Sequence, residues 1–520
     1  MATPAELLAE VEAARALRDD SARADAVARQ HALGKMTARE RIAALLDADS
    51  FEETGALVEP GRDTADTEDL QAPGDGVVTG FGLVGGRPVT VVAFDFTIVG
   101  GSNGEHGEWK LLRILEQCEQ HGLPLIMLLD GGGHRIQEGL DSRHFARGTT
   151  VFQRFANLSG WVPMVAAIMG PGFAGPSNFA ALADFVVMVE GTSTMGIAGP
   201  ALVAAATGEV LTKDELGSAE VQTERAGIAD MAATDDHAAL NAIRDYLAFL
   251  PSNASQAAPI LACVDPFDRR DESLATIVPP STRRAYDMRK VVDGIVDRGS
   301  QFELRPTHAR NVLTVLARIE GRPIGVIANQ PMQIGGTLTV PACEKAAHFI
   351  SLCDAFGIPL LYLIDVPGFM VGPTAEATGL ARRSGRLLFE IGQATVPRFS
   401  VVLRKGYGLA YVAMAGGRSF AADLALAWPT AEICAMSVEG AVDVAYRKKL
   451  DQADDRAAAR DSLVARFRTQ LGPLKAVEAY GIDDVIDPRD TRRALALAMR
   501  RATQRKRQPE TGRRHPISPI

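Results

Sequence analysis

The sequence has little of what marks secreted, membrane-spanning or nucleic-acid-binding proteins. Its five cysteines are an odd number in 520 residues and form no C-x-x-C pair, which argues against a disulfide framework or a zinc ribbon. No apolar run reaches about 18 residues, so no transmembrane helix is predicted. The N-terminus lacks the basic and apolar regions of a signal peptide. The net charge of −9 argues against nucleic acid or a membrane surface as a general partner. We therefore expect a cytoplasmic protein.

The familiar signatures of side-chain catalysis are also missing. No H-E-x-x-H motif or His/Cys cluster predicts a metal site, and no G-x-S-x-G elbow predicts a serine nucleophile. Neither a Walker A motif nor a clean G-x-G-x-x-G is present. Asp130, Glu138 and Asp365 have no spacing that requires an acid–base pair. The sequence therefore offers no obvious side-chain catalyst.

Glycine, by contrast, is abundant: 49 of the 520 residues exceed the average share of about 7%. Many of these glycines belong to an internal repeat. Gly86-Arg87-Pro88 recurs as Gly321-Arg322-Pro323, and residues 122–130 recur as 357–365, both 235 residues further along the chain. One gapless offset over roughly 50 residues predicts two copies of one fold. A polar, proline-containing stretch near 264–285 is the predicted linker.

Each copy has the pattern of a parallel α/β sheet. A short apolar run, a helix and a continuous apolar run follow one another at 89–94, 108–121 and 125–129, and again at 324–328, 344–356 and 360–364. Continuous apolar runs are typical of buried parallel strands, which need helical crossovers. Before the first copy, residues 4–30 predict one long helix, and Thr37 with Glu40 forms a capping box that predicts a second helix.

Two glycine-rich loops, 169–176 and 404–411, align with each other in the repeat. Each follows an apolar strand and precedes a predicted buried helix. Amides at a helix N-terminus can hold a phosphate or the oxyanion of an enolate or thioester, and the absence of phosphate-loop motifs favours the oxyanion. The alternative is a tight turn that only allows close packing. Two symmetry-related copies favour the functional interpretation.

Further glycine-rich segments follow the strands 125–129 and 360–364. Gly131-Gly132-Gly133-His134-Arg135 and Pro367-Gly368-Phe369 could form a second wall of a pocket. His134 is by itself more typical of a structural or pocket-lining histidine than of a base. The C-terminal residues 492–514 are basic, which fits a solvated helix face, a subunit contact or a site for a phosphate-rich ligand such as the CoA nucleotide.

Seven segments and the basic, proline-containing ending 513–520 form a set that is far more specific than any single glycine loop: they are 34–41, 100–105, 135–139, 328–331, 365–369, 404–408 and 427–430. On these segments the chain resembles the carboxyltransferase (β) subunit of biotin-dependent acyl-CoA carboxylases, and most of all the propionyl-CoA branch. The resemblance runs nearly from end to end.

The resemblance implies an α/β protein of two tandem crotonase-like (ClpP/crotonase) domains related by internal duplication, at residues 1–265 and 280–515. It implies a homohexamer whose active sites lie between the N-terminal domain of one subunit and the C-terminal domain of another. The substrates are an acyl-CoA and carboxybiotin. The biotin ureido nitrogen takes the α-proton of the acyl-CoA, so the protein needs no side-chain base. It supplies backbone amides for the thioester enolate and for the ureido oxygen.

The family's functional positions transfer residue by residue. Ala174 and Gly175 are implied to stabilise the enolate, and Leu409 and Ala410 the biotin oxygen. The implied substrate-binding residues are Gly133, His134, Phe173, Tyr407 and Val412. The implied biotin-binding residues are Gly368, Phe369 and Gly408. No metal is implied.

The sequence departs from the family where these loops are concerned. Ala174 replaces the first glycine of a Gly-Gly pair, and Leu409 replaces the second glycine of Gly-Gly-Ala. The chain has no biotin attachment motif and no ATP-binding module, so a biotin carboxylase and carrier (α) subunit is the expected partner. Two alternatives remain: a biotin-dependent acyl-CoA decarboxylase subunit, and a catalytically weak scaffold subunit of a mixed complex. A crotonase-type hydratase is less favoured, because its paired acidic catalysts are not recognisable.

Overall fold

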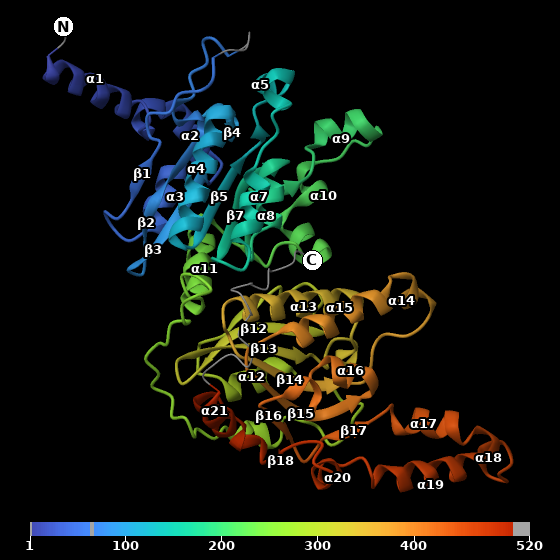
Figure 1. Ribbon diagram of the computed structural model, residues 1–520. Coiled ribbons are helices and arrows are strands. Elements are labelled where there is room, and N and C mark those ends of the chain that lie inside the picture. Colours follow the sequence, from blue (N-terminus) through green and yellow to red (C-terminus); the bar gives the residue numbers. More distant parts are fainter. Residues whose placement is uncertain (1–2, 63–66, 503–520) are drawn as a thin grey trace. The chain divides into compact units, whose positions relative to one another are not determined.

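The computed structural model describes residues 3–62 and 67–502, which divide between Ala257 and Ala258 into two compact units. Each unit contains one mixed sheet with helices on its faces (Figure 1). The predicted α/β fold with two similar tandem sheets is confirmed. No helix within the described ranges is both long enough and apolar enough to cross a bilayer.

The sheet of unit 1 begins with an antiparallel hairpin and continues with parallel strands. In spatial order its strands are β1 (Glu52–Thr54), β2 (Val77–Val84), β3 (Arg87–Phe94), β5 (Leu125–Gly131), β7 (Met164–Phe173), β8 (Phe185–Val189) and β10 (Met231–Ala233), and β9 (Thr194–Gly196) pairs with the end of β7. A separate parallel pair joins β4 (Ser102–Asn103) to β6 (Gly133–His134).

Helices cover this sheet and extend the unit at its N-terminus. They are α1 (Pro4–Ala16), α2 (Ala24–Ala32), α3 (Ala38–Leu45), α4 (Glu105–His121), α5 (Ile136–Gly139), α6 (Ser142–Phe145), α7 (Val151–Leu158), α8 (Gly175–Ala181), α9 (Pro200–Thr207), α10 (Lys213–Gly217) and α11 (Asp236–Phe249). One apolar core of the unit lies between helices α4 and α7 and side chains of β5, β7 and β8.

Unit 2 repeats this sheet strand for strand. Its order is β11 (Phe302–Leu304), β12 (Val312–Ile319), β13 (Arg322–Asn329), β14 (Leu360–Val366), β15 (Arg398–Tyr407), β16 (Leu424–Ala427) and β18 (Asp484–Val485), and β17 (Glu432–Cys434) pairs with the end of β15. Its helices are α12 (Met288–Ile295), α13 (Val340–Ala355), α14 (Pro373–Ala377), α15 (Leu380–Gln393), α16 (Gly408–Ala413), α17 (Val438–Ala445), α18 (Arg447–Asp451), α19 (Arg456–Arg468), α20 (Pro473–Glu478) and α21 (Thr491–Arg501).

Equivalent side chains make equivalent contacts in the two units. The buried Lys110 Nζ donates to the carbonyl of Val77, and Lys345 Nζ donates to that of Val312, 235 residues further on in both cases. The hairpin turns are also matched, because Asp47 accepts the amide of Gly86 at 2.7 Å and Asp297 accepts that of Gly321 at 2.7 Å. The duplication therefore extends from the strand order to individual hydrogen bonds.

The N-terminal arm differs from the predicted single helix over 4–30. Helix α1 ends at Ala16, a short 3₁₀ turn follows at Asp20–Arg23, and α2 begins at Ala24. The helix is interrupted at Asp19, which is extended (φ −68°, ψ 148°). Because α1 buries none of its residues, no packing continues it into α2. The capping box predicted at Thr37 and Glu40 is confirmed at the start of α3.

Candidate functional site

In unit 1, the predicted loop 169–176 is mostly strand. Strand β7 continues to Phe173, because Pro171, Gly172 and Phe173 pair with β9 beyond the point where its pairing with β8 ends. The chain then turns at Ala174, whose φ of 56° and ψ of −112° lie in a region that side-chain-bearing residues rarely adopt. Helix α8 begins at the next residue, so the turn is a single residue long.

The two predicted oxyanion donors of this turn differ in their hydrogen bonding. The N–H of Ala174 donates to the carbonyl of Gly196 on β9 at 3.1 Å. The N–H of Gly175 is at the first position of α8, where no carbonyl of the helix can accept it. The helix dipole adds positive potential there. Ala174 therefore shapes the turn, and Gly175 provides its available amide.

Ser177 fixes the turn from inside α8. Its buried Oγ accepts the N–H of Gly196 at 2.8 Å, and it lies within hydrogen-bond distance of the carbonyls of Gly172 and Gly196. These contacts join the end of β7, the end of β9 and the first turn of α8. The turn that presents the Gly175 amide is thus fixed by three elements. Ser177 was not among the predicted site residues.

Gly133 lies directly beside this amide. A Cβ atom at Gly133 would be 3.1 Å from the Phe173 carbonyl oxygen, 3.5 Å from Pro176 Cδ and 3.6 Å from the Gly175 nitrogen. The φ of Gly133 is +91°, which also favours glycine. The structure therefore brings Gly133 and Gly175 together, as expected for two walls of one pocket.

The two other predicted pocket residues of unit 1 point to different neighbours. The Phe173 ring packs over Gly196 and Gly199, whose added Cβ atoms would each lie 3.6 Å from it. The half-buried His134 follows Gly133 in β6, and its ring centroid is 6.5 Å from that of Phe145. Phe173 therefore contributes its carbonyl to the Gly133 side, whereas its ring covers the start of the β9–α9 connection.

A buried ionic cluster supports the β4–β6 pair. Arg135 is 2.7 Å from Asp75 Oδ1 and 2.6 Å from Glu138 Oε1, and all three side chains are at most 2% exposed. Asp75 accepts the amide of Gly107, and Glu138 accepts that of Glu105, so both carboxylates hold the first turn of α4. Burial raises the pKa of Asp75, and the Arg135 charge opposes this shift. Glu138 is therefore a structural ion-pair partner.

In unit 2, the equivalent turn follows the same plan. Strand β15 runs through Tyr407, and Gly408, the first residue of α16, takes the positive φ (+62°). A Cβ at Gly408 would lie 3.0 Å from the carbonyl oxygen of Ala435. The amides of Leu409 and Ala410 belong to the first turn of α16, where no helix carbonyl accepts them. The predicted loop 404–411 is thus a strand end that passes directly into a helix start, with the chain turning at Gly408.

The remaining predicted residues of unit 2 surround this turn unequally. The Tyr407 hydroxyl donates to Glu432 on β17 at 2.5 Å, and burial together with that carboxylate raises the pKa of Tyr407. The Leu409 side chain is 57% exposed, whereas Val412 is half-buried. Gly368 and Phe369 follow β14, whose last residue pairs with Gly406, and both lie along the segment at Leu338.

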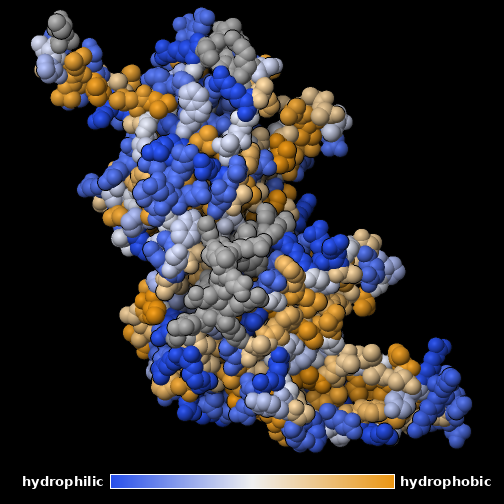
Figure 2. Space-filling model, viewed as in Figure 1, coloured by the Kyte–Doolittle hydropathy of each residue, from blue (hydrophilic) through white to orange (hydrophobic). Residues whose placement is uncertain are grey.

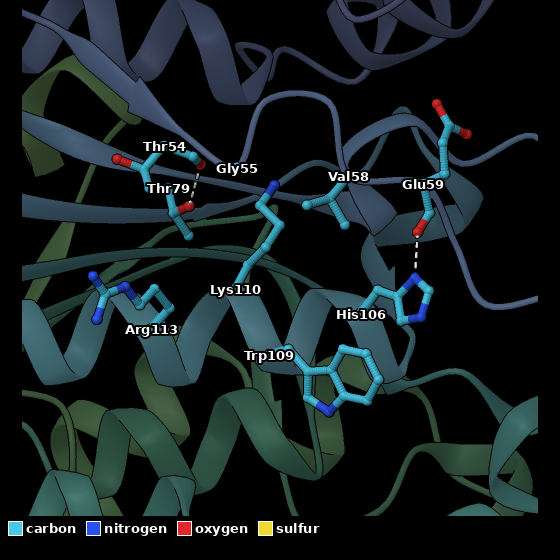
Figure 3. A pocket seen from close by; sticks show the side chains of 9 residues that line it. All are labelled: Thr54, Gly55, Val58, Glu59, Thr79, His106, Trp109, Lys110 and Arg113. Atoms are coloured by element: carbon cyan, nitrogen blue, oxygen red, sulfur yellow. Dashed lines mark hydrogen bonds between the residues drawn. The ribbon is translucent and has the colours of Figure 1, made fainter.

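A pocket of about 470 Å³ in unit 1 contains none of the predicted site residues. It lies between β1, β2 and α4, and Figure 3 shows its lining side chains: Thr54, Gly55, Val58, Glu59, Thr79, His106, Trp109, Lys110 and Arg113. His106 is hydrogen-bonded to the Glu59 carbonyl, and its ring is 4.8 Å from that of Trp109. The half-exposed Trp109 could have indicated this pocket in the sequence. Helical periodicity alone, however, does not distinguish a pocket-lining tryptophan from an ordinary surface residue.

Titratable groups are otherwise paired rather than clustered. Over residues 3–62 and 67–502, no group of three or more His, Cys, Asp or Glu side chains is arranged to hold a metal ion. The buried carboxylates of Asp130 and Asp365 each contact two cationic side chains. The described side chains thus supply no free acid–base pair at either turn, and the available chemistry is that of backbone amides.

Comparison with known proteins gives matches along nearly the whole chain. Residues 29–516 match the family described as Carboxyl transferase domain. The propionyl-CoA carboxylase carboxyltransferase subunit of Haloferax mediterranei is 40% identical over 488 residues, which cover 94% of each chain. The methylmalonyl-CoA decarboxylase subunit alpha of Propionigenium modestum is 37% identical and covers 91% of each chain. A transcarboxylase 12S structure, described as a hexamer assembly with methylmalonyl-coenzyme A and methylmalonic acid bound, has a TM-score of 0.92 at 38% identity and covers 99% of both chains.

Proposed function

The chain belongs to the carboxyl transferase domain family, as a carboxyltransferase subunit of the acyl-CoA carboxylase type, and from this premise we propose that it moves a carboxyl group between biotin and the α-carbon of an acyl-CoA. The observation that carries the proposal is the pair of equivalent turns, one per unit. Each follows a central parallel strand, takes a positive φ at one residue and then presents first-turn helix amides. Such amides suit an oxygen that becomes negative during the reaction.

The turn of unit 1 is the proposed site of the acyl-CoA. The Gly175 amide stabilises the thioester oxygen as it becomes an enolate, with Ala174 setting the turn that aims this amide. Gly133, His134 and Phe173 form the surrounding wall. Removal of one donor of this kind typically lowers the rate by about 10²–10³-fold, so backbone groups can account for much of the catalysis.

The turn of unit 2 is the proposed site of biotin. Bound there, biotin supplies the carboxyl group and the ureido nitrogen that takes the α-proton. Adjacent amides of Leu409 and Ala410 fit one carbonyl oxygen, because neither has an acceptor within α16. Gly368, Phe369 and Gly408 shape the approach of biotin. Tyr407, which is fixed by Glu432, and Val412 are proposed to bind the acyl-CoA substrate instead.

The relatives indicate the protein partners. Because the chain is similar to carboxyltransferase subunits of propionyl-CoA carboxylases, a biotin carboxylase and carrier subunit is the proposed partner that presents biotin. We also propose a homo-oligomer, a hexamer as described for transcarboxylase 12S. Helix α9 buries none of its residues, and Ile197 and Leu202 are 73% and 61% exposed. Apolar side chains gather over this helix (Figure 2), as expected for a surface that a second copy covers.

The test is turnover of methylmalonyl-CoA by the purified chain with free biotin. The proposal requires biotin-dependent release of propionyl-CoA. A decarboxylase subunit would give the same half-reaction, and the 37% identity to the Propionigenium modestum subunit favours keeping this second candidate. Carboxylation of propionyl-CoA when the carrier subunit, ATP and bicarbonate are added would separate the two. No turnover under either condition would favour the scaffold role.

A further inference from the structure

The two units place an aspartate at the same point, the end of a central strand, and neutralise it differently. Asp130 in β5 and Asp365 in β14 are both 0% exposed. A buried carboxylate requires charged or hydrogen-bonding partners. In unit 2 the partner comes from the next strand, where Arg404 donates to Asp365 from Nε at 3.0 Å and Nη2 lies at 2.9 Å.

Unit 1 has no such arginine on its next strand. Gly131 pairs with Gly172 as Val366 pairs with Gly406, so Gly170 occupies the position of Arg404. A Cβ at Gly170 would lie 1.9 Å from Asp130 Oδ1 and 2.5 Å from Lys35 Nζ. The missing side chain at Gly170 thus leaves the space that Lys35 fills.

The cations of Asp130 come instead from residues 34–41, between the end of α2 and the middle of α3. Lys35 Nζ is 2.7 Å from Oδ1, while Arg41 Nη1 at 2.7 Å and Gln30 Nε2 at 2.9 Å donate to Oδ2. Burial lowers the pKa of Lys35, and the Asp130 charge opposes this shift. Both cations belong to the segment 34–41. This is one of the segments on which the family resemblance rests, and none of its residues has a role in the proposed reaction.

Arg41 connects the two strands that lead to the Gly175 turn. Besides Asp130 at the end of β5, its Nη2 donates to the carbonyl of Met169 in β7 at 3.1 Å, and its Nε donates to Asp236 at 2.7 Å. Strand β5 leads to Gly133, and β7 leads to Ala174. One guanidinium therefore sets the spacing of both walls of the candidate pocket.

We infer that Lys35 and Arg41 are positioning residues for the Gly175 amide, acting through Asp130 and the Met169 carbonyl, an inference that rests on the proposed function for its effect on the reaction. Residues 34–41 thereby support the proposed acyl-CoA site in unit 1. In unit 2, Arg404 of β15 contacts Asp365 of β14 directly, so the proposed biotin site does not depend on Lys35 or Arg41.

Helix α3, which contains Arg41, also offers a matched control for the test. Arg39 precedes Arg41 by two residues, but its guanidinium pairs with Glu53 at 3.0 and 3.1 Å and touches neither Asp130 nor β7. Arg41→Lys and Arg39→Lys both keep the charge and lose a planar, multidentate donor. Only the first loses the bridge between β5 and β7. Lys35→Met provides a second variant should Arg41→Lys fold poorly.

Hydrogen exchange and kinetics are measured on the purified full chain. Arg41→Lys should speed amide exchange over 164–181 about tenfold, whereas Arg39→Lys leaves it unchanged. For methylmalonyl-CoA with free biotin, kcat should fall about 10- to 100-fold in Arg41→Lys while KM stays within about threefold. Equal exchange and equal kcat in the two arginine variants would overturn the inference. If the wild-type chain shows no biotin-dependent turnover, the proposed function fails, and the exchange comparison alone decides whether Arg41 holds the turn.

Discussion

Replacing Gly133 by alanine tests whether the Gly175 amide is the oxyanion donor of unit 1. The added methyl carbon would lie 3.6 Å from the Gly175 nitrogen and 3.1 Å from the Phe173 carbonyl oxygen. An oxygen accepting from that amide must approach to about 2.9 Å, so the methyl group competes for the same space. We expect kcat/KM for methylmalonyl-CoA to fall about 10²–10³-fold, which corresponds to ~3–4 kcal/mol of transition-state stabilisation.

The substitution also strains the backbone, and a control separates this effect. Gly133 has a φ of +91°, so alanine should cost about 1–3 kcal/mol of folding stability. The neighbouring Gly132 has no positive φ, and an added Cβ meets no atom within 4 Å. Gly132→Ala should therefore keep both activity and stability.

The assay is biotin-dependent release of propionyl-CoA, with urea unfolding recorded for each variant. Activity is compared where both variants are fully folded. If Gly133→Ala turns over as fast as Gly132→Ala, the amide of Gly175 is not where the thioester oxygen binds. If both variants lose activity equally, the loop at 131–133 matters for a reason other than this contact.

Three further outcomes follow from single residues. Ala174→Gly should raise the free energy of unfolding by about 1 kcal/mol, because Ala174 has a φ of 56° and a ψ of −112°; a loss of stability in urea unfolding would contradict the strain. Burial raises the pKa of Asp184 to about 8, so the native state binds its proton more tightly than the unfolded chain, and the stability that this group contributes is lost as pH rises from about 4 to 8. In Asp184→Asn the Tm should therefore drop less between pH 5 and pH 8 than in the wild type, and an unchanged drop would argue against a protonated native Asp184. Leu202→Glu, on a helix that buries none of its residues, should reduce the molar mass in light scattering to smaller assemblies, and an intact hexamer would exclude α9 from the interface.

Local signals in the sequence predicted the duplicated framework well. The 235-residue offset, the apolar runs at 125–129 and 360–364 and the capping box at Thr37 all correspond to observed elements. These features depend on neighbours in the chain or on a repeat of the same neighbours. They can therefore be predicted without a structure.

The extent of the glycine-rich segments was not predictable in the same way. Residues 169–173 and 404–407 were expected as loops, but they continue β7 and β15 because β9 and β17 add a partner at their ends. Both partners come from later in the chain and are three residues long. The hydrogen bond that pairs Ala174 with Gly196 arises from the same late pairing.

Ion pairs between residues far apart in the chain could not be predicted from the sequence either. Asp130 lies 95 residues from Lys35 and 89 from Arg41, and no spacing rule connects them. The signal was nevertheless present as a difference between the copies, since Gly170 aligns with Arg404. A missing cation at an otherwise repeated position predicts that another segment supplies it. The roles of Gly133, His134, Phe173 and the unit 2 residues in binding remain predictions.

Removing one backbone N–H at the unit 2 turn tests directly whether the amides of this turn contribute to catalysis. Proline is tolerated in the first turn of a helix and lacks the amide, so Leu409→Pro deletes a proposed donor while Leu409→Ala keeps it. The 57% exposed Leu409 side chain makes its own loss a small perturbation. We predict that Leu409→Ala retains biotin-dependent turnover of methylmalonyl-CoA within about threefold of the wild type, and that Leu409→Pro loses about 10²–10³-fold. Equal rates in the two folded variants would contradict catalysis by this amide.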